Sequence, residues 1–141
     1  MTQADRDWET FFRDYGAAAL EPAPERIAAL YAESFIVAGP RGSAVYTNDG
    51  QFLDWLRQVH EFNESSGMTA MMVVSIKDST SLSGLHQLVR VEWGTRFKKT
   101  GERLITFQIS YLLERLSGGW KILAYVSEKD QEEEMRALGV L

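Results

Sequence analysis

Apolar side chains recur at helical spacing near the start of the chain. Trp8, Phe11, Phe12, Tyr15 and Ala19 occupy positions i, i+3, i+4, i+7 and i+11. This spacing places them on one stripe of a helix, with polar residues between them. The pattern predicts an amphipathic helix that buries an aromatic face.

A proline-rich break follows this helix at residues 21–24. Pro24 can begin a second short helix, because the missing N–H of proline costs little in a first turn. Ile27, Leu30 and Tyr31 would form its buried face. Residues 35–38 then read as a short strand, and the Gly-Pro-Arg-Gly run at 39–42 reads as a turn.

A third helix is predicted after Asn48. The Asn48 side chain can cap it, and Gln51 lies at the spacing from which a glutamine reaches back to the cap. Gly67 is expected to stop the helix after the serines at 65 and 66. The apolar stripe of this helix consists of Phe52, Trp55, Leu56 and Val59.

From residue 69 onward the hydrophobic period changes from near 3.6 to near 2. Runs rich in β-branched and aromatic residues are separated by Thr, Ser and Gly clusters. Strands are predicted at 69–78, 85–97, 104–116 and 120–127, with turns at 79–84, 98–103 and 117–119. Such short connections favour an antiparallel meander.

A terminal helix is predicted over residues 130–138. Asp130 and Glu133 have the spacing of a capping box, and Gly139 follows the last turn. We find no linker and no internal repeat, so residues 1–141 are expected to form one domain with one core.

Composition narrows the class of partner. The chain is 45% hydrophobic and 25% charged, which is ordinary globular usage, and its net charge is −5. An acidic chain lacks the basic surface that nucleic acids require. Without a membrane-length apolar run or a signal-peptide pattern, the expected location is cytoplasmic. The absence of cysteine excludes disulfides and thiolate metal sites.

Two short motifs carry a resemblance. "LYAESF" at residues 30–35 joins a helix to a strand, and "GWKI" at residues 119–122 begins the last strand. With the order of elements, they make the chain similar to the nuclear transport factor 2-like superfamily, which includes SnoaL-like and ketosteroid isomerase-like proteins. The resemblance implies an α+β cone: three N-terminal helices packed in a curved antiparallel or mixed sheet, and a short C-terminal helix.

The resemblance also implies a pocket inside the cone and a homodimer that pairs through the outer sheet face. Strand alternation then predicts which side chains point inward. The inward set is Val89, Val91, Trp93, Ile105, Phe107, Ile109, Tyr111, Ile122, Ala124 and Val126. The opposite faces carry mixed polar side chains, among them Arg90, Glu92, Gln108, Lys121 and Tyr125.

Acid–base enzymes of this superfamily need an ionisable group inside the pocket. No carboxylate falls on a predicted inward face. Several related sequences place histidines on the last strand, but the matching run here is ILAYVS at residues 122–127. Whether the chain is an enzyme therefore stays open.

The best catalytic candidate is His60, at the edge of the third helix's stripe, because imidazole titrates near neutral pH. Tyr15 and Tyr111 could polarise a ligand carbonyl, since a buried phenol needs a hydrogen-bond partner. The two histidines, His60 and His86, lack nearby ligand partners, so neither a metal site nor a cofactor is expected.

The expected function is binding of a small, largely apolar organic ligand. The predicted ligand-binding residues are Trp8, Phe12, Trp55, Val91, Trp93, Phe107, Ile109 and Ala124. One alternative is an isomerase, cyclase or dehydratase that transfers a proton in the pocket. The second alternative is a protein-interaction or assembly module, which would expose an apolar patch.

Overall fold

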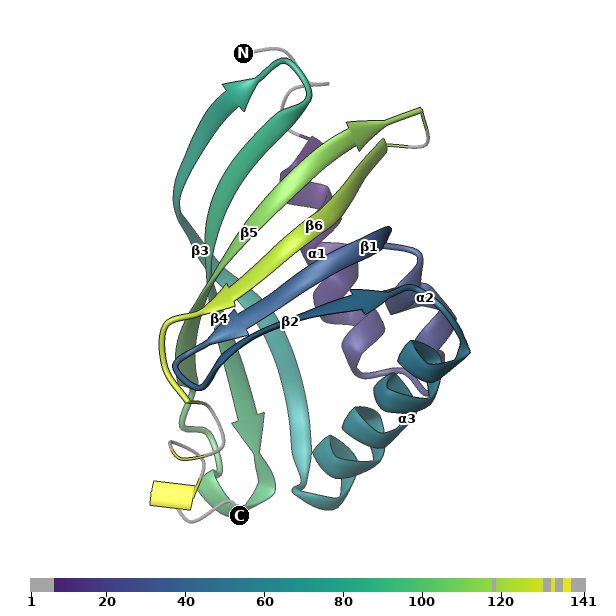
Figure 1. Cartoon of the computed structure of the whole chain (residues 1–141). Coiled ribbons are helices and arrows are strands. Elements are labelled where there is room, and N and C mark those ends of the chain that lie inside the picture. The colour runs from purple at the N-terminus through teal and green to yellow at the C-terminus, as the bar shows by residue number, and fades with distance from the viewer. Residues whose placement is uncertain (1–6, 118, 131–132, 134–135, 138–141) are drawn as a thin grey trace.

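A computed structural model of the protein describes residues 7–117, 119–130, 133, 136 and 137. Its helices are α1 (Asp7–Ala19), α2 (Pro24–Ala28) and α3 (Gly50–Ser65). These pack against a curved six-stranded sheet, so the predicted α+β cone is confirmed (Figure 1). No helix in the described part of the chain has the length and apolar character needed to cross a membrane.

The sheet is mixed and has the strand order β2-β1-β6-β5-β4-β3. Its strands are β1 (Tyr31–Gly39), β2 (Gly42–Thr47), β3 (Met68–Ser83), β4 (His86–Phe97), β5 (Ile105–Leu116) and β6 (Gly119–Ser127). The predicted meander is the β3 to β6 part, and β1 joins it by pairing parallel to β6. Strand β2 was not predicted, because the Gly-Pro turn suggested an end to the strand and not a hairpin.

The core lies between α1 and the concave face of β4 and β5. Phe12 is fully buried and makes an edge contact with Trp93 and a tilted contact with Tyr111, at centroid separations of 6.3 Å and 4.6 Å. A Cβ at Gly16 would lie 3.2 Å from the Trp93 ring and 3.3 Å from the Met71 carbonyl oxygen. Only a residue without a side chain fits this approach comfortably, which explains a glycine inside a helix.

The start of α3 differs from the prediction. Asp49, not Asn48, caps the helix, and its Oδ1 accepts from the Phe52 amide at 3.1 Å. The Asn48 amide instead donates to the carbonyl oxygens of Ala28 and Tyr31 at 2.8 Å and 3.1 Å. Asn48 thus ties the entrance of α3 to the end of α2 and the start of β1.

Other boundaries shift by a few residues. Helix α2 ends at Ala28, so Leu30 and Tyr31 belong to the connection and to β1 rather than to the helix. Strand β3 continues to Ser83, and only a tight turn at 84–85 separates it from β4. The predicted terminal helix lies mostly outside the described residues, although Asp130 Oδ1 accepts from the Glu133 amide at 3.2 Å.

The last strand contains a β-bulge that changes which side chains face the core. Leu112 pairs with Ala124, whereas the next residue, Leu113, pairs with Ile122, so Leu123 has no partner on β5. Because side chains alternate, an extra residue moves the following positions to the opposite face. Ile122 is buried as predicted, but Ala124 and Val126 face outward, and Tyr125 faces inward.

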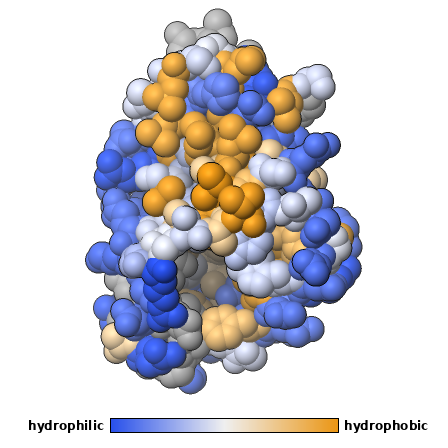
Figure 2. All heavy atoms as spheres, viewed as in Figure 1, coloured by the Kyte–Doolittle hydropathy of each residue, from blue (hydrophilic) through white to orange (hydrophobic). Residues whose placement is uncertain are grey.

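The outer face of the sheet exposes apolar side chains (Figure 2). Strand pairing aligns them in one row that crosses five strands: Val45, Ile36, Ala124, Leu112 and Leu88. Val45 is 75% exposed and Ile36 is 44% exposed. Figure 2 also shows the surface hollowed below this patch.

We expect Asn48→Asp to lower the free energy of unfolding by about 2–4 kcal/mol. The change removes two donated hydrogen bonds and places a carboxylate beside two carbonyl oxygens. Urea denaturation at pH 7 measures it. The matched variant is Asp49→Asn, which should cost less than about 1 kcal/mol because Asn caps as well as Asp. Equal losses in the two variants would contradict this assignment.

Candidate functional site

A cavity of about 320 Å³ lies between α1, α3 and the concave face of the sheet. α1 supplies one wall and α3 the opposite one, while β1, β3, β4, β5 and β6 contribute to the floor. Most of the residues around it are aliphatic or aromatic, which is typical of sites for small organic molecules. Hydrophobic patterning of α3 explains this wall, since Phe52, Trp55, Leu56 and Val59 all line the cavity.

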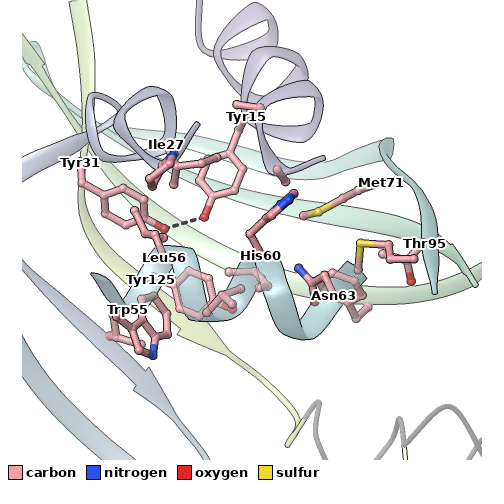
Figure 3. Close-up of a pocket in the computed structure, with 18 of the residues that line it drawn as sticks. Tyr15, Ile27, Tyr31, Trp55, Leu56, His60, Asn63, Met71, Thr95 and Tyr125 are labelled. Carbon is pink, nitrogen blue, oxygen red and sulfur yellow. Dashed lines mark hydrogen bonds between the residues drawn. The ribbon is translucent and has the colours of Figure 1, made fainter. Parts of the chain in front are cut away.

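One end of the cavity carries hydrogen-bonded tyrosines. The Tyr15 and Tyr31 hydroxyls are 2.7 Å apart, so one donates to the other (Figure 3). Two hydroxyls hold two protons and this bond uses one, which leaves one O–H to donate. The Tyr111 hydroxyl accepts from the Trp93 indole at 2.9 Å, and Tyr125 packs against the Tyr111 ring at 5.6 Å.

Burial keeps these phenols protonated. Desolvation raises the pKa of Tyr15, and the bond to Tyr31 offsets part of this. Desolvation, followed by the neighbouring phenols, raises the pKa of Tyr31 and Tyr111 well above the ordinary value. They can therefore donate hydrogen bonds at physiological pH, and they are not general bases.

His60 projects from α3 into the cavity, between the tyrosine pair and the end that carries Asn63 and Thr95 (Figure 3). Its side chain is 21% exposed, and its Nε2 lies 3.3 Å from Glu64 Oε2. Its Nδ1 is buried and has no hydrogen-bond partner. A buried, unpartnered ring nitrogen costs free energy, so a bound molecule that supplied a partner would be favoured there.

The cavity offers little charge to a ligand. Among the described residues that line it there is no Lys or Arg, and the one acid is Glu21. Glu21 is exposed and forms an ion pair with Arg26. Burying an anion here would leave it without a counter-charge, which is costly. The described residues also contain no group of three or more metal-ligating side chains.

The structure brings together some of the predicted site residues and separates others. Those that line the cavity are His60, Tyr15, Tyr111, Trp55, Phe107 and Ile109. Trp8, Phe12, Val91 and Trp93 lie in the packed core and do not line the cavity. Ala124 faces outward because of the β6 bulge. The cavity occupies only the wide end of the cone, a distinction that alternation cannot make.

Several lining residues were not predicted. Tyr31 was assigned to a helix, and Tyr125 to the outer face, because the pattern gave no sign of the bulge. Asn63 lies three residues after His60 on α3, so helical spacing could have placed both on one face. Met68, Met71 and Thr95 line the far end.

Comparison with known proteins agrees with this architecture. A family model described as NTF2-like protein (DUF6841) matches residues 5–130. No curated protein matches the sequence. The chain is similar to solved structures with low sequence identity, which indicates a shared fold only.

Three of these structures illustrate the likeness. An NTF-2 like protein of unknown function from Shewanella oneidensis MR-1 has a TM-score of 0.69 at 16% identity, over 89% of this chain and 98% of that chain. A cystatin-like domain from Nostoc punctiforme PCC 73102 has 0.73 at 12%, over 100% and 88%. A ketosteroid isomerase-like protein from Erwinia carotovora atroseptica SCRI1043 has 0.62 at 23%, over 86% and 92%.

Alkaline pH should destabilise the protein through the buried tyrosines. An unfolded tyrosine loses its proton near pH 10. The folded state keeps the proton because the pKa values of Tyr31 and Tyr111 are raised. The unfolded state then binds fewer protons, so the free energy of unfolding falls as pH rises above about 10.

Tyr31→Phe should reduce that fall by up to about 1.4 kcal/mol per pH unit. Urea denaturation of both proteins between pH 9 and pH 11.5 measures the slopes. The difference between the two proteins at pH 7 provides the baseline for effects unrelated to titration. Identical slopes would show that Tyr31 does not retain its proton.

Proposed function

This chain belongs to the family of NTF2-like proteins (DUF6841), and from that premise we propose that its cavity binds a small, largely apolar, uncharged organic molecule. The observation that carries the proposal is the cavity of about 320 Å³ with apolar walls and a few convergent polar groups. Volumes of this size accommodate fused aromatic rings or similar compounds.

The polar groups define how such a molecule would be oriented. The Tyr15–Tyr31 pair has one O–H to donate toward an acceptor such as a carbonyl oxygen. At the middle of the cavity, His60 Nδ1 lacks a partner. The lack of Lys and Arg among the described lining residues favours a neutral ligand over a carboxylate.

Binding can be tested with 6-propionyl-2-(dimethylamino)naphthalene, a neutral ketone whose fluorescence rises and shifts in apolar surroundings. At about 0.3 kcal/mol per non-hydrogen atom, a dissociation constant of roughly 0.2 mM or tighter is expected. Ala19→Phe, which fills the cavity from α1, should weaken binding at least tenfold, on the order of 1.4 kcal/mol.

The control is Ala17→Phe, two residues away on the exposed face of the same helix. This variant should bind like the wild type, and thermal unfolding verifies that both variants fold. If the probe does not bind the wild type, or if both variants bind equally well, the proposal fails.

A second candidate function is proton transfer in the same cavity, as in an isomerase, cyclase or dehydratase. It is favoured by the presence of His60, Tyr15 and Tyr111 around one space. In this scheme the protonated phenols would polarise a carbonyl, and His60 would accept a proton from the carbon beside it.

Deuterium exchange tests this step without knowledge of the substrate. For 2-acetylnaphthalene in deuterium oxide, proton NMR would follow the loss of the methyl signal beside the carbonyl. A proton-transfer site should accelerate this loss, and His60→Gln should remove on the order of 100-fold of the acceleration. His86→Gln is the control, since His86 lies on the β3–β4 hairpin and bonds Ser83 and Glu114. If exchange is no faster with the protein than in buffer, the proton-transfer function fails and ligand binding is the function that is left.

The outer sheet face supports a homodimer as the assembly that carries these cavities. Its row of exposed apolar side chains spans β2 to β4 and is bordered by charged residues such as Arg90 and Glu92. A patch of this kind is typical of a protein interface. The same exposed patch would also suit the alternative function, in which the chain is a protein-interaction module.

A further inference from the structure

The two edges of the sheet are built differently. Edge strand β3 carries Lys77 and Asp78 and has four register shifts against β4. Charges and bulges of this kind discourage pairing with another strand. Edge strand β2, at the opposite margin in Figure 1, has neither Lys, Arg, Asp, Glu nor Pro, and all six of its residues are exposed.

The hydrogen-bond phase of β2 follows from its pairing with β1. The main-chain N–H of Asn48 donates to the Glu33 carbonyl oxygen at 2.8 Å, and the register is regular from there to Gly39 opposite Gly42. In an antiparallel pair, every second residue directs its main-chain groups toward the partner strand. Tyr46 and Ala44 therefore bond β1, while Ser43, Val45 and Thr47 direct their N–H and C=O groups away from the sheet.

These three outward residues are arranged symmetrically about Val45. If a second copy pairs antiparallel with Val45 opposite Val45, then Ser43 of each copy lies opposite Thr47 of the other. Each of these positions is then a hydrogen-bonded pair. In such a two-fold symmetric contact, the central residue lies opposite the same residue of the second copy. A charged residue there would face a like charge, and a neutral edge avoids this repulsion.

Charge at the two ends of the edge fits the same register. Arg41 precedes β2 and Asp49 follows it, each four residues from Val45 and both exposed. In the symmetric pairing, Arg41 of one copy, which forms an ion pair with Asp130 of its own chain, comes beside Asp49 of the other at both ends. The apolar row that ends at Val45 also continues without a break into the row of the second copy.

From these observations we infer that β2 is a self-association edge, through which two copies join their sheets by antiparallel pairing centred on Val45. The contact is distinct from pairing of the outer faces and does not depend on what the cavity binds. Its partner is a second copy of this chain.

Single-cysteine variants test the register, because the chain has no cysteine of its own. Residues opposite each other in a hydrogen-bonded pair have Cα atoms about 5.5 Å apart, a distance that a disulfide spans. Under mild oxidation, Val45→Cys should form a linked dimer within minutes. Val74→Cys on β3 is the matched control, since Val74 is an exposed valine on the other edge strand, and it should remain largely unlinked.

Sedimentation equilibrium gives an independent measure. The wild type should associate, and Val45→Lys, which places two lysines opposite each other, should weaken association at least about tenfold. Val74→Lys should leave it unchanged. Amide exchange by NMR should show protection of Val45 and Thr47 that increases with protein concentration.

Any of the following outcomes would contradict the inference that β2 is a self-association edge. Equal cross-linking of the two cysteine variants, or a monomer at all concentrations, overturns it. A dimer that Leu88→Lys, at the far end of the outer-face row, weakens as much as Val45→Lys does would assign association to the outer face instead. Protection of Val45 and Thr47 that is independent of concentration would mean that a segment of the same chain covers the edge.

Discussion

Trp93 and Tyr111, joined by a hydrogen bond from the indole to the hydroxyl, form with Phe12 the aromatic cluster through which α1 packs on the sheet. Aromatic pairs of this geometry add about 0.5–1.5 kcal/mol each beyond their buried area. The contact is possible because Gly16 allows the helix to approach the Trp93 ring closely. The narrow end of the cone is thereby filled, and the unfilled volume collects at the wide end, beneath α3.

The division between core and cavity explains why the site was only partly predictable. Periodicity placed Phe12, Tyr15, Trp93 and Tyr111 correctly as inward residues, and it located α1 and α3 within a residue or two. It could not tell which inward residues touch other side chains and which border empty space. That distinction depends on the taper of the cone, a property of the whole sheet. The hairpin partner β2 was missed for a similar reason, since none of its six residues is buried and they carry little hydrophobic pattern.

The chemistry of the cavity follows from what surrounds each polar group. Buried among aromatic rings, the phenols of Tyr31 and Tyr111 have pKa values well above their ordinary value, which makes them permanent donors. Asn48 stabilises the same wall, because its side-chain amide donates a hydrogen bond to the Tyr31 carbonyl oxygen. His60 differs from these groups in having one ring nitrogen near the surface and Glu64, and the other buried. The site therefore combines fixed phenol donors with an imidazole whose two nitrogens lie in different surroundings.

The bulge at Leu123 has a consequence for how this cavity could diverge. The side chains that follow it face inward or outward according to whether Leu123 bulges or pairs, not according to their type. If Leu123 paired regularly with Leu112 instead of forming a bulge, Tyr125 would turn out of the cavity, and the alanine and valine on either side of it would face in. A phenol-bearing wall would become an aliphatic one without any substitution. In such a curved sheet, the presence or absence of a bulge in the last strand can therefore act as a coarse control of ligand polarity, and substitutions as a fine one.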